Sequence, residues 1–147
     1  TNWSWSFVTD YIADHLNELG PPDKIDANVT LHDSCHYVRG IEPATDSPRK
    51  ILAAIPGVQI SEMKNKKMDA LCCGGYAITG TGGPGYRFRD RRLAQAGDTG
   101  ADLLGVYCPG CHMTLGAGAA QKGLETVSIL SLLGKSLGIE PAWADNF

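Results

Sequence analysis

Short apolar runs alternate with amphipathic segments over most of this chain. Four runs have the length of β-strands, and they fall at residues 28–32, 58–62, 102–107 and 125–128. Four further segments have the pattern of helices, at residues 48–55, 87–96, 111–122 and 129–137. Strands that alternate with helices are typical of a parallel sheet. We therefore predict an α/β fold, with a small Rossmann-like parallel sheet flanked by helices.

The first 25 residues are predicted to form an N-terminal helix or linker. Helical spacing over residues 3–19 joins Val8, Tyr11, Ile12, His15, Leu16 and Leu19. Gly20-Pro21-Pro22 then ends the segment, because proline cannot continue a helix. Residues 26–147 are predicted to form a single domain that carries the chemistry.

Composition and charge exclude some functions and favour others. The net charge of −3 gives no support for a nucleic-acid partner. No apolar run approaches the roughly 20 residues needed to span a bilayer, so we expect no direct membrane insertion. The chain starts without Met and without a signal peptide, which favours a cytoplasmic, reducing environment and a piece of a longer subunit.

Five cysteines form the most informative motif: Cys35, Cys72, Cys73, Cys108 and Cys111. An odd number cannot pair fully within one chain, and in a reducing compartment clustered cysteines more often bind metal or catalyse reactions. Neighbouring Cα atoms lie only about 3.8 Å apart. A single small ion therefore rarely takes both members of an adjacent pair, whereas a cluster of several irons could use both sulfurs. The pattern predicts a redox metal centre.

The predicted strands bring these cysteines together. Cys35 and Cys108 directly follow two of them, and the adjacent pair follows a third after a polar turn. In open α/β sheets, ligands bind beyond the carboxyl ends of the strands. The glycine-rich stretch 74–85 is predicted to be a loop that wraps the centre. The run Arg87–Arg92 after it is interpreted as a solvated helix face.

The cysteine spacing and its flanks resemble the CCG (cysteine-rich) domain family. The segment His32-Asp-Ser-Cys35-His36 is similar to the family's His-Asp-Pro-Cys-His, with Ser34 in place of the usual proline. Cys72-Cys73-Gly74 and Cys108-Pro-Gly-Cys111 match the later elements, and the resemblance covers about residues 28–137. The domain occurs in the B and D subunits of heterodisulfide reductases and in iron–sulfur subunits of related oxidases.

The resemblance implies a noncubane [4Fe-4S] cluster held by all five cysteines. It implies a heterodisulfide-reductase-type oxidoreductase that reduces a disulfide, small or protein-borne, to thiols. An iron–sulfur or flavin subunit would donate electrons, and partner subunits could attach the domain to a membrane complex. His36 follows a candidate ligand and is the candidate proton donor, with His112 a weaker one, whereas His32 is interpreted as structural.

Two alternatives remain. One is a non-catalytic electron-transfer or zinc-binding assembly module of a flavin-dependent oxidase or dehydrogenase complex, although zinc takes four ligands and would leave a cysteine idle. The other is a thioredoxin-like dithiol at Cys108 and Cys111, which leaves the remaining cysteines unexplained.

Overall fold

The computed structural model describes residues 5–40, 43–81 and 83–139 and confirms the predicted α/β architecture. Its sheet has four parallel strands in the order β2-β1-β3-β4. They are β1 (Ala27–Leu31), β2 (Val58–Ile60), β3 (Leu103–Val106) and β4 (Glu125–Ser128). Each agrees with a predicted strand to within two residues at either end.

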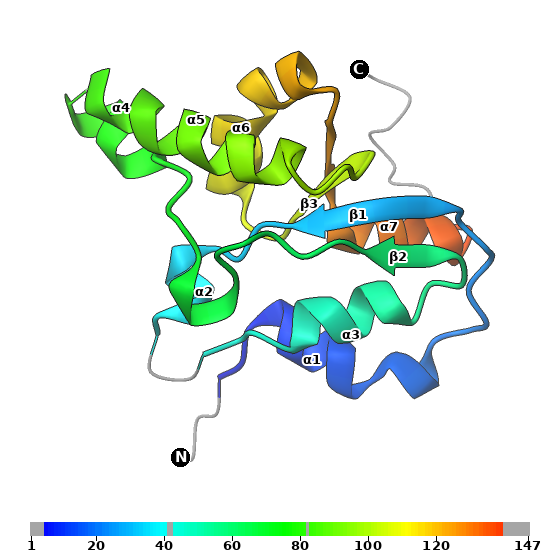
Figure 1. Cartoon of the computed structure of the whole chain (residues 1–147). Helices are drawn as coiled ribbons and strands as arrows, with labels where there is room; N and C mark the ends of the chain where they lie inside the picture. The colour runs from blue at the N-terminus through cyan, green and yellow to red at the C-terminus, as the bar shows by residue number, and fades with distance from the viewer. Residues whose placement is uncertain (1–4, 41–42, 82, 140–147) are drawn as a thin grey trace.

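Helices cover both faces of the sheet (Figure 1). One face carries α1 (Val8–Asp14), α3 (Ser47–Ala53) and α7 (Ile129–Ser136), and the other carries α5 (Gly83–Gly97) and α6 (Pro109–Ala119). Two short helices, α2 (Cys35–Val38) and α4 (Gly75–Thr81), lie near the carboxyl ends of the strands. Single turns complete the set: η1 (Leu16–Glu18), η2 (Lys67–Asp69) and η3 (Ala120–Lys122). Among the described residues, none of these helices has the length and apolar character of a bilayer span.

The sheet separates two hydrophobic cores because successive strand residues point to opposite faces. Val29 and Leu31 of β1 pack with the helices α3 and α7. Leu104 and Val106 of β3 pack with α5 and α6 on the other face. All four side chains are buried. Gly105 of β3 lies beside Val29 and Leu31 of the neighbouring strand. A Cβ added to it would come within 2.9 Å of a Val29 methyl group.

The helix predicted over residues 3–19 is shorter in the structure and is rotated. It begins at Val8, ends at Asp14 and continues as a single 3₁₀ turn, while residues 1–4 lie outside the described part. The buried stripe contains Thr9, Ile12 and Leu16, whereas Val8 and Tyr11 are exposed. Leu19, which follows the 3₁₀ turn, is exposed as well. The prediction was wrong on these three residues because the helix buries Thr9, a small polar side chain, instead. Ile12 and Leu16 of this segment pack against the core beside β1. The division at residue 25 stays a prediction.

The loop predicted for residues 74–85 is helical in the structure. α4 begins at Gly75, α5 begins at Gly83, and the two helices pack against each other. Each glycine within a helix costs about 1 kcal/mol relative to alanine, and the prediction followed that preference. Tertiary packing overrides it here, because an added Cβ on Gly85 would overlap the backbone nitrogen of Ile78 in α4.

Candidate metal centre

The centre of the site lies where the chain changes direction across the sheet. β1 is followed by β2 on one side and lies beside β3 on the other, so the connections leave β1 and β3 in opposite directions. Such a switch point leaves a crevice beyond the carboxyl ends of the two strands. Cys35 begins α2 there, four residues after β1 ends at Leu31. Cys108 follows β3 and caps α6.

The local sequence at the start of α6 places the sulfurs of Cys108 and Cys111 on the same side of the helix. Cys108 has extended backbone angles at the N-cap of α6, and Pro109 takes the first helical position, where its missing N–H costs nothing. Cys111 then lies one turn further along the helix. The spacing from N-cap to third helical residue therefore presents both sulfurs to the same crevice.

All five cysteines line one pocket of about 360 Å³. All five are free thiols; Cys73 and Cys111 are buried, and the other three are partly exposed. The sulfurs of Cys73 and Cys111 lie 3.4 Å apart, and that of Cys111 lies 3.7 Å from Ser34 Oγ. His36 lines the same pocket, close to the ring of Tyr76, while His112 lies outside this lining. The pocket thus brings together the five predicted ligands and His36, the preferred candidate for proton donor.

Hydrogen bonding around Cys73 favours its thiolate. The Cys111 thiol donates to the Cys73 sulfur, and this contact, the nearby His32 and the backbone N–H of Gly75 lower the pKa of Cys73 to about 4, against the opposing effect of burial. The same contact, followed by burial, raises the pKa of Cys111. Next to this pair, the Gly74 N–H donates to the Cys72 sulfur over 3.3 Å. Backbone amides after the adjacent cysteines therefore stabilise negative sulfur.

His32 is part of this buried group, although a structural role was predicted for it from the sequence. One ring nitrogen of His32 and the sulfurs of Cys73 and Cys111 lie within 4.8 Å of one another. The side chain is 1% exposed, and burial lowers its pKa, so the imidazole is neutral. The signal that could have found it is position: it follows β1 directly, three residues before Cys35.

A buried carboxylate fixes the segment that carries the adjacent cysteines. Asp33, fully buried, accepts two bonds from Arg49 at 2.9 and 3.0 Å and a third from the Lys67 N–H at 2.7 Å. Arg49 also donates to Glu62. Arg39 from the end of α2 donates to the Ala70 carbonyl over 2.7 Å. These bonds attach the chain before Cys72 to the end of β1, which sets the distance between Cys35 and the pair.

Replacing Asp33 by asparagine is expected to destabilise the protein. It should also reduce the dependence of the free energy of unfolding on pH in the acid range. Burial raises the pKa of Asp33, but bonds from Arg49 and Lys67 outweigh it, so the folded-state pKa lies below the ordinary 3.8. The stabilisation is therefore present above about pH 4 and is lost as the pH falls through the folded-state value. We expect a loss of roughly 3 kcal/mol at pH 7 for Asp33→Asn in urea unfolding.

The matched control for that change is Asp46→Asn. Asp46 is paired with Lys67 at 2.8 Å but is 69% exposed, so solvent screens the pair. Its removal should leave both the free energy of unfolding and its pH dependence close to those of the unaltered chain. Equal effects of the two substitutions would contradict the role given to Asp33.

The arginine run is only partly a solvated face. Arg87 and Arg91 are exposed, as predicted, but Arg92 is fully buried. Its guanidinium donates to His32 Nδ1 at 2.9 Å, to the Asn65 carbonyl at 2.6 Å and to Gln95 at 3.1 Å. Burial lowers its pKa to about 10, which still leaves it charged at neutral pH. The prediction was wrong here because helical periodicity among four arginines does not show which one points inward.

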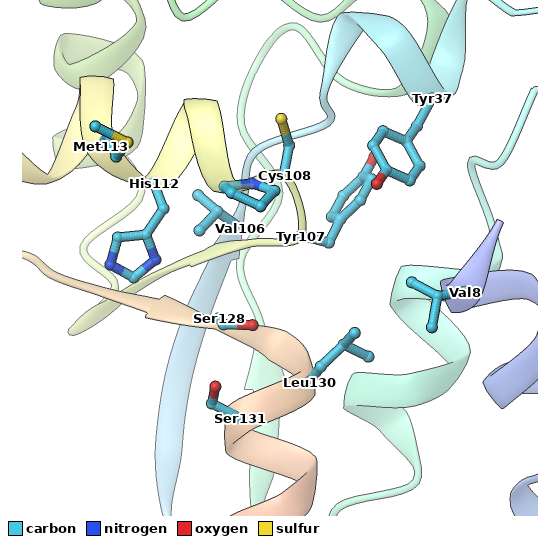
Figure 2. Close-up of a pocket in the computed structure, with 11 residues that line it drawn as sticks. Val8, Tyr37, Val106, Tyr107, Cys108, His112, Met113, Ser128, Leu130 and Ser131 are labelled. Carbon is cyan, nitrogen blue, oxygen red and sulfur yellow. The ribbon is translucent and has the colours of Figure 1, made fainter. Parts of the chain in front are cut away.

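A second pocket of about 560 Å³ adjoins the first and shares Cys108 and Met113 with it. Figure 2 shows His112, Ser128 and Ser131 on one side of it and Tyr37, Val8 and Leu130 on the other. The lining is mainly apolar with a few hydroxyl groups and one imidazole. This composition suits an organic molecule with a carbon chain and a polar end.

Comparisons with known proteins agree with this site. The family described as CCG, cysteine-rich domain, matches residues 29–116. The chain is 32% identical over 143 residues to the D subunit of the dihydromethanophenazine:CoB–CoM heterodisulfide reductase of Methanosarcina acetivorans, covering 90% of the chain and 35% of that protein. It is 34% identical over 126 residues to the Bacillus subtilis protein named Probable iron-sulfur-binding oxidoreductase FadF, covering 82% and 18%.

A third relative is Lactate utilization protein A of Bacillus licheniformis, 29% identical over 129 residues, with 86% of the chain and 53% of that protein covered. The chain thus spans about a third of the reductase protein and about half of the lactate utilization protein. The matched segment contains all five cysteines, and its family match extends over more than half of the sequence. The chain belongs to the CCG cysteine-rich domain family.

Proposed function

We propose that this chain is an iron–sulfur redox domain of a larger oxidoreductase and that it reduces a disulfide to two thiols. Cys35, Cys72, Cys73, Cys108 and Cys111 would hold a noncubane [4Fe-4S] cluster. The observation that carries the proposal is the convergence of all five sulfurs on one pocket from three separate segments of the chain. Thiolates are the soft ligands that iron–sulfur clusters and zinc prefer.

The residues of the site fit a cluster of several irons better than one zinc ion. Structural zinc takes four ligands, and five thiols surround this pocket. Any metal here would need negative sulfur. The lowered pKa of Cys73 and the hydrogen bond from the Gly74 N–H to the Cys72 sulfur both favour it. When bound, the cluster would supply single electrons and an iron open to substrate sulfur.

The overall reaction sets what the protein must provide. Reduction of R–S–S–R′ breaks one S–S bond, consumes two electrons and two protons and releases R–SH and R′–SH. The electrons would come from an iron–sulfur or flavin subunit; the presence of partner subunits is supported by the reductase relative, which is named as one subunit of its enzyme. The second pocket beside Cys108 would bind the organic part of the disulfide. The protons would come from side chains at the pocket.

His36 is proposed as one proton donor, because it lines the cysteine pocket and histidine is the side chain that most often transfers protons in catalysis. We expect His36→Ala to slow thiol release by about 10²-fold or more while leaving the iron content unchanged. The measurement is turnover with a disulfide substrate, with iron content determined on the same samples. His112→Ala is the comparison, since it lies beside the pocket for the organic part. Unchanged turnover in His36→Ala would remove the proton role.

A second candidate is a non-catalytic electron-transfer or zinc-binding assembly module. His32, Cys73 and Cys111 offer three ligand atoms within 4.8 Å of one another. Three atoms this close could hold a single ion, which favours this candidate. In that case substrate would be oxidised on a flavin subunit, and the chain would carry electrons or hold the complex together.

One experiment separates the two candidates. Protein purified without oxygen is analysed for iron, zinc and acid-labile sulfide, and EPR spectra of the oxidised sample are recorded with and without added thiol. About four irons and four sulfides per chain, with an EPR signal that thiol alters, would support the disulfide-cleaving cluster. Zinc without sulfide would contradict it and favour the assembly module.

A further inference from the structure

His32 and Arg92 form a buried pair directly behind Cys73. Arg92 is fully buried, and in the part of the chain that the structure describes no carboxylate forms an ion pair with it. Its acceptors are neutral: His32 Nδ1, two main-chain carbonyls and the amide of Gln95. A buried guanidinium whose hydrogen-bond acceptors are all neutral is costly. Its charge acts on the nearby Asp33 carboxylate and on Cys111.

The donor on Arg92 determines the tautomer of His32. An arginine Nε always carries a hydrogen and can only donate, so the nitrogen it faces must present a lone pair. Arg92 Nε lies 2.9 Å from His32 Nδ1. The proton of the neutral imidazole is therefore on Nε2. This is the reverse of a metal-bound histidine, which donates its second ring N–H to a carbonyl, carboxylate or water.

His32 Nε2 is buried and has no nitrogen or oxygen partner within the described residues. A buried N–H without an acceptor costs about 1–3 kcal/mol. The acceptor within reach is sulfur, because the sulfurs of Cys73 and Cys111 lie within 4.8 Å of a ring nitrogen. Of the two, Cys73 is the one whose side chain is hydrogen-bonded to the His32 ring.

We infer that His32 is a hydrogen-bond donor to the Cys73 sulfur, held in that tautomer by Arg92, and that it is not itself a metal ligand. The inference rests on the proposed function only in that Cys73 binds a metal. It makes His32 and Arg92 positioning residues that set the electron affinity of the centre. A hydrogen bond to a ligand sulfur and a nearby positive charge both favour the reduced, more negative state.

The tautomer can be tested in the unaltered chain. The protein is loaded with ¹¹³Cd²⁺ after ¹⁵N-histidine labelling, and NMR spectra are recorded for the ring nitrogens. We expect His32 Nε2 to carry a proton and to show no coupling to cadmium, with Nδ1 unprotonated. Coupling between a His32 nitrogen and ¹¹³Cd would overturn the inference while leaving metal binding intact. Failure of the chain to bind cadmium at its cysteines would overturn the proposed function as well.

The effect on the iron-loaded protein is tested with paired variants. His32→Met removes the donor at similar length, whereas His32→Gln keeps an N–H near the position of Nε2. We expect the reduction potential of the centre, measured by EPR-monitored titration, to fall in His32→Met and to return toward the original value in His32→Gln. An unchanged potential in His32→Met would contradict the inference, and if that variant loses its cluster, the cadmium spectra decide.

Arg92→Met should lower the potential too, because it removes both the charge and the constraint on the tautomer. Arg91→Met is its matched control: it removes the same charge from the same helix, one residue away, on the exposed side. The control should leave the potential unchanged. Equal shifts in the two variants would mean that the overall charge, and not the buried contact with His32, is responsible.

Discussion

Replacing Cys73 by serine is expected to lower the affinity of the protein for its metal by more than about 100-fold. Replacing a residue that only hydrogen-bonds to a metal ligand typically costs about 10- to 100-fold. Cys73 is buried, its sulfur lies 3.4 Å from that of Cys111, and its pKa is lowered to about 4. It is therefore the thiolate already formed at neutral pH. A serine hydroxyl stays protonated there and is a harder ligand than iron–sulfur centres use.

The measurement is iron and sulfide content after anaerobic purification, followed by titration of the apoprotein with iron and sulfide. Met113→Leu is the matched control, because Met113 lines the same pocket with a sulfur that cannot ionise and is 79% exposed. It should retain full metal content. Iron content in Cys73→Ser equal to that of the control would show that the centre does not depend on this thiolate.

Cys35→Ser tests the remaining alternative to a metal centre. Burial and the neighbouring Cys72 raise the pKa of Cys35, which lies on the partly exposed side of the pocket. A cluster held by five sulfurs should still lose stability and activity when Cys35 is removed. A dithiol enzyme using Cys108 and Cys111 would keep its activity, so the same variant distinguishes the two chemistries.

The sheet and the grouping of the cysteines could be predicted because both depend on short-range patterns. The strands at 28–32 and 102–107 had the expected length, and parallel strands bring their carboxyl ends to one edge whatever lies between them. Cys35 and Cys108 therefore had to be neighbours once the strand order placed β1 beside β3.

The failures concern residues whose role depends on long-range packing. Arg92 is one of four arginines on a single helix, and its neighbours in sequence do not show that it reaches His32, 60 residues earlier. The stretch 74–85 carries so many glycines that local preference predicts a loop. Only the approach of α4 to α5 explains why glycine, with no Cβ, is required there.

Gly85→Ala is accordingly expected to destabilise the protein by about 3 kcal/mol, at the upper end of overpacking changes. An added Cβ would overlap the Ile78 nitrogen and lie 2.5 Å from its Cγ1, and the first of these contacts is with backbone that cannot rotate away. The two helices would have to separate. α4 begins two residues after Cys73, so their separation should also displace that sulfur from Cys111.

Gly83→Ala is the control within the same helix, because no atom lies within 4 Å of the Cβ it would add. Alanine favours helix over glycine by roughly 0.8–1 kcal/mol, so this variant should be as stable as the original chain or slightly more stable. Urea unfolding measures both variants, and iron content shows whether the metal site survives. If the two substitutions had the same small effect, α4 and α5 would not be in close contact, and the glycines would have to serve the loop around the metal centre that the sequence alone predicted.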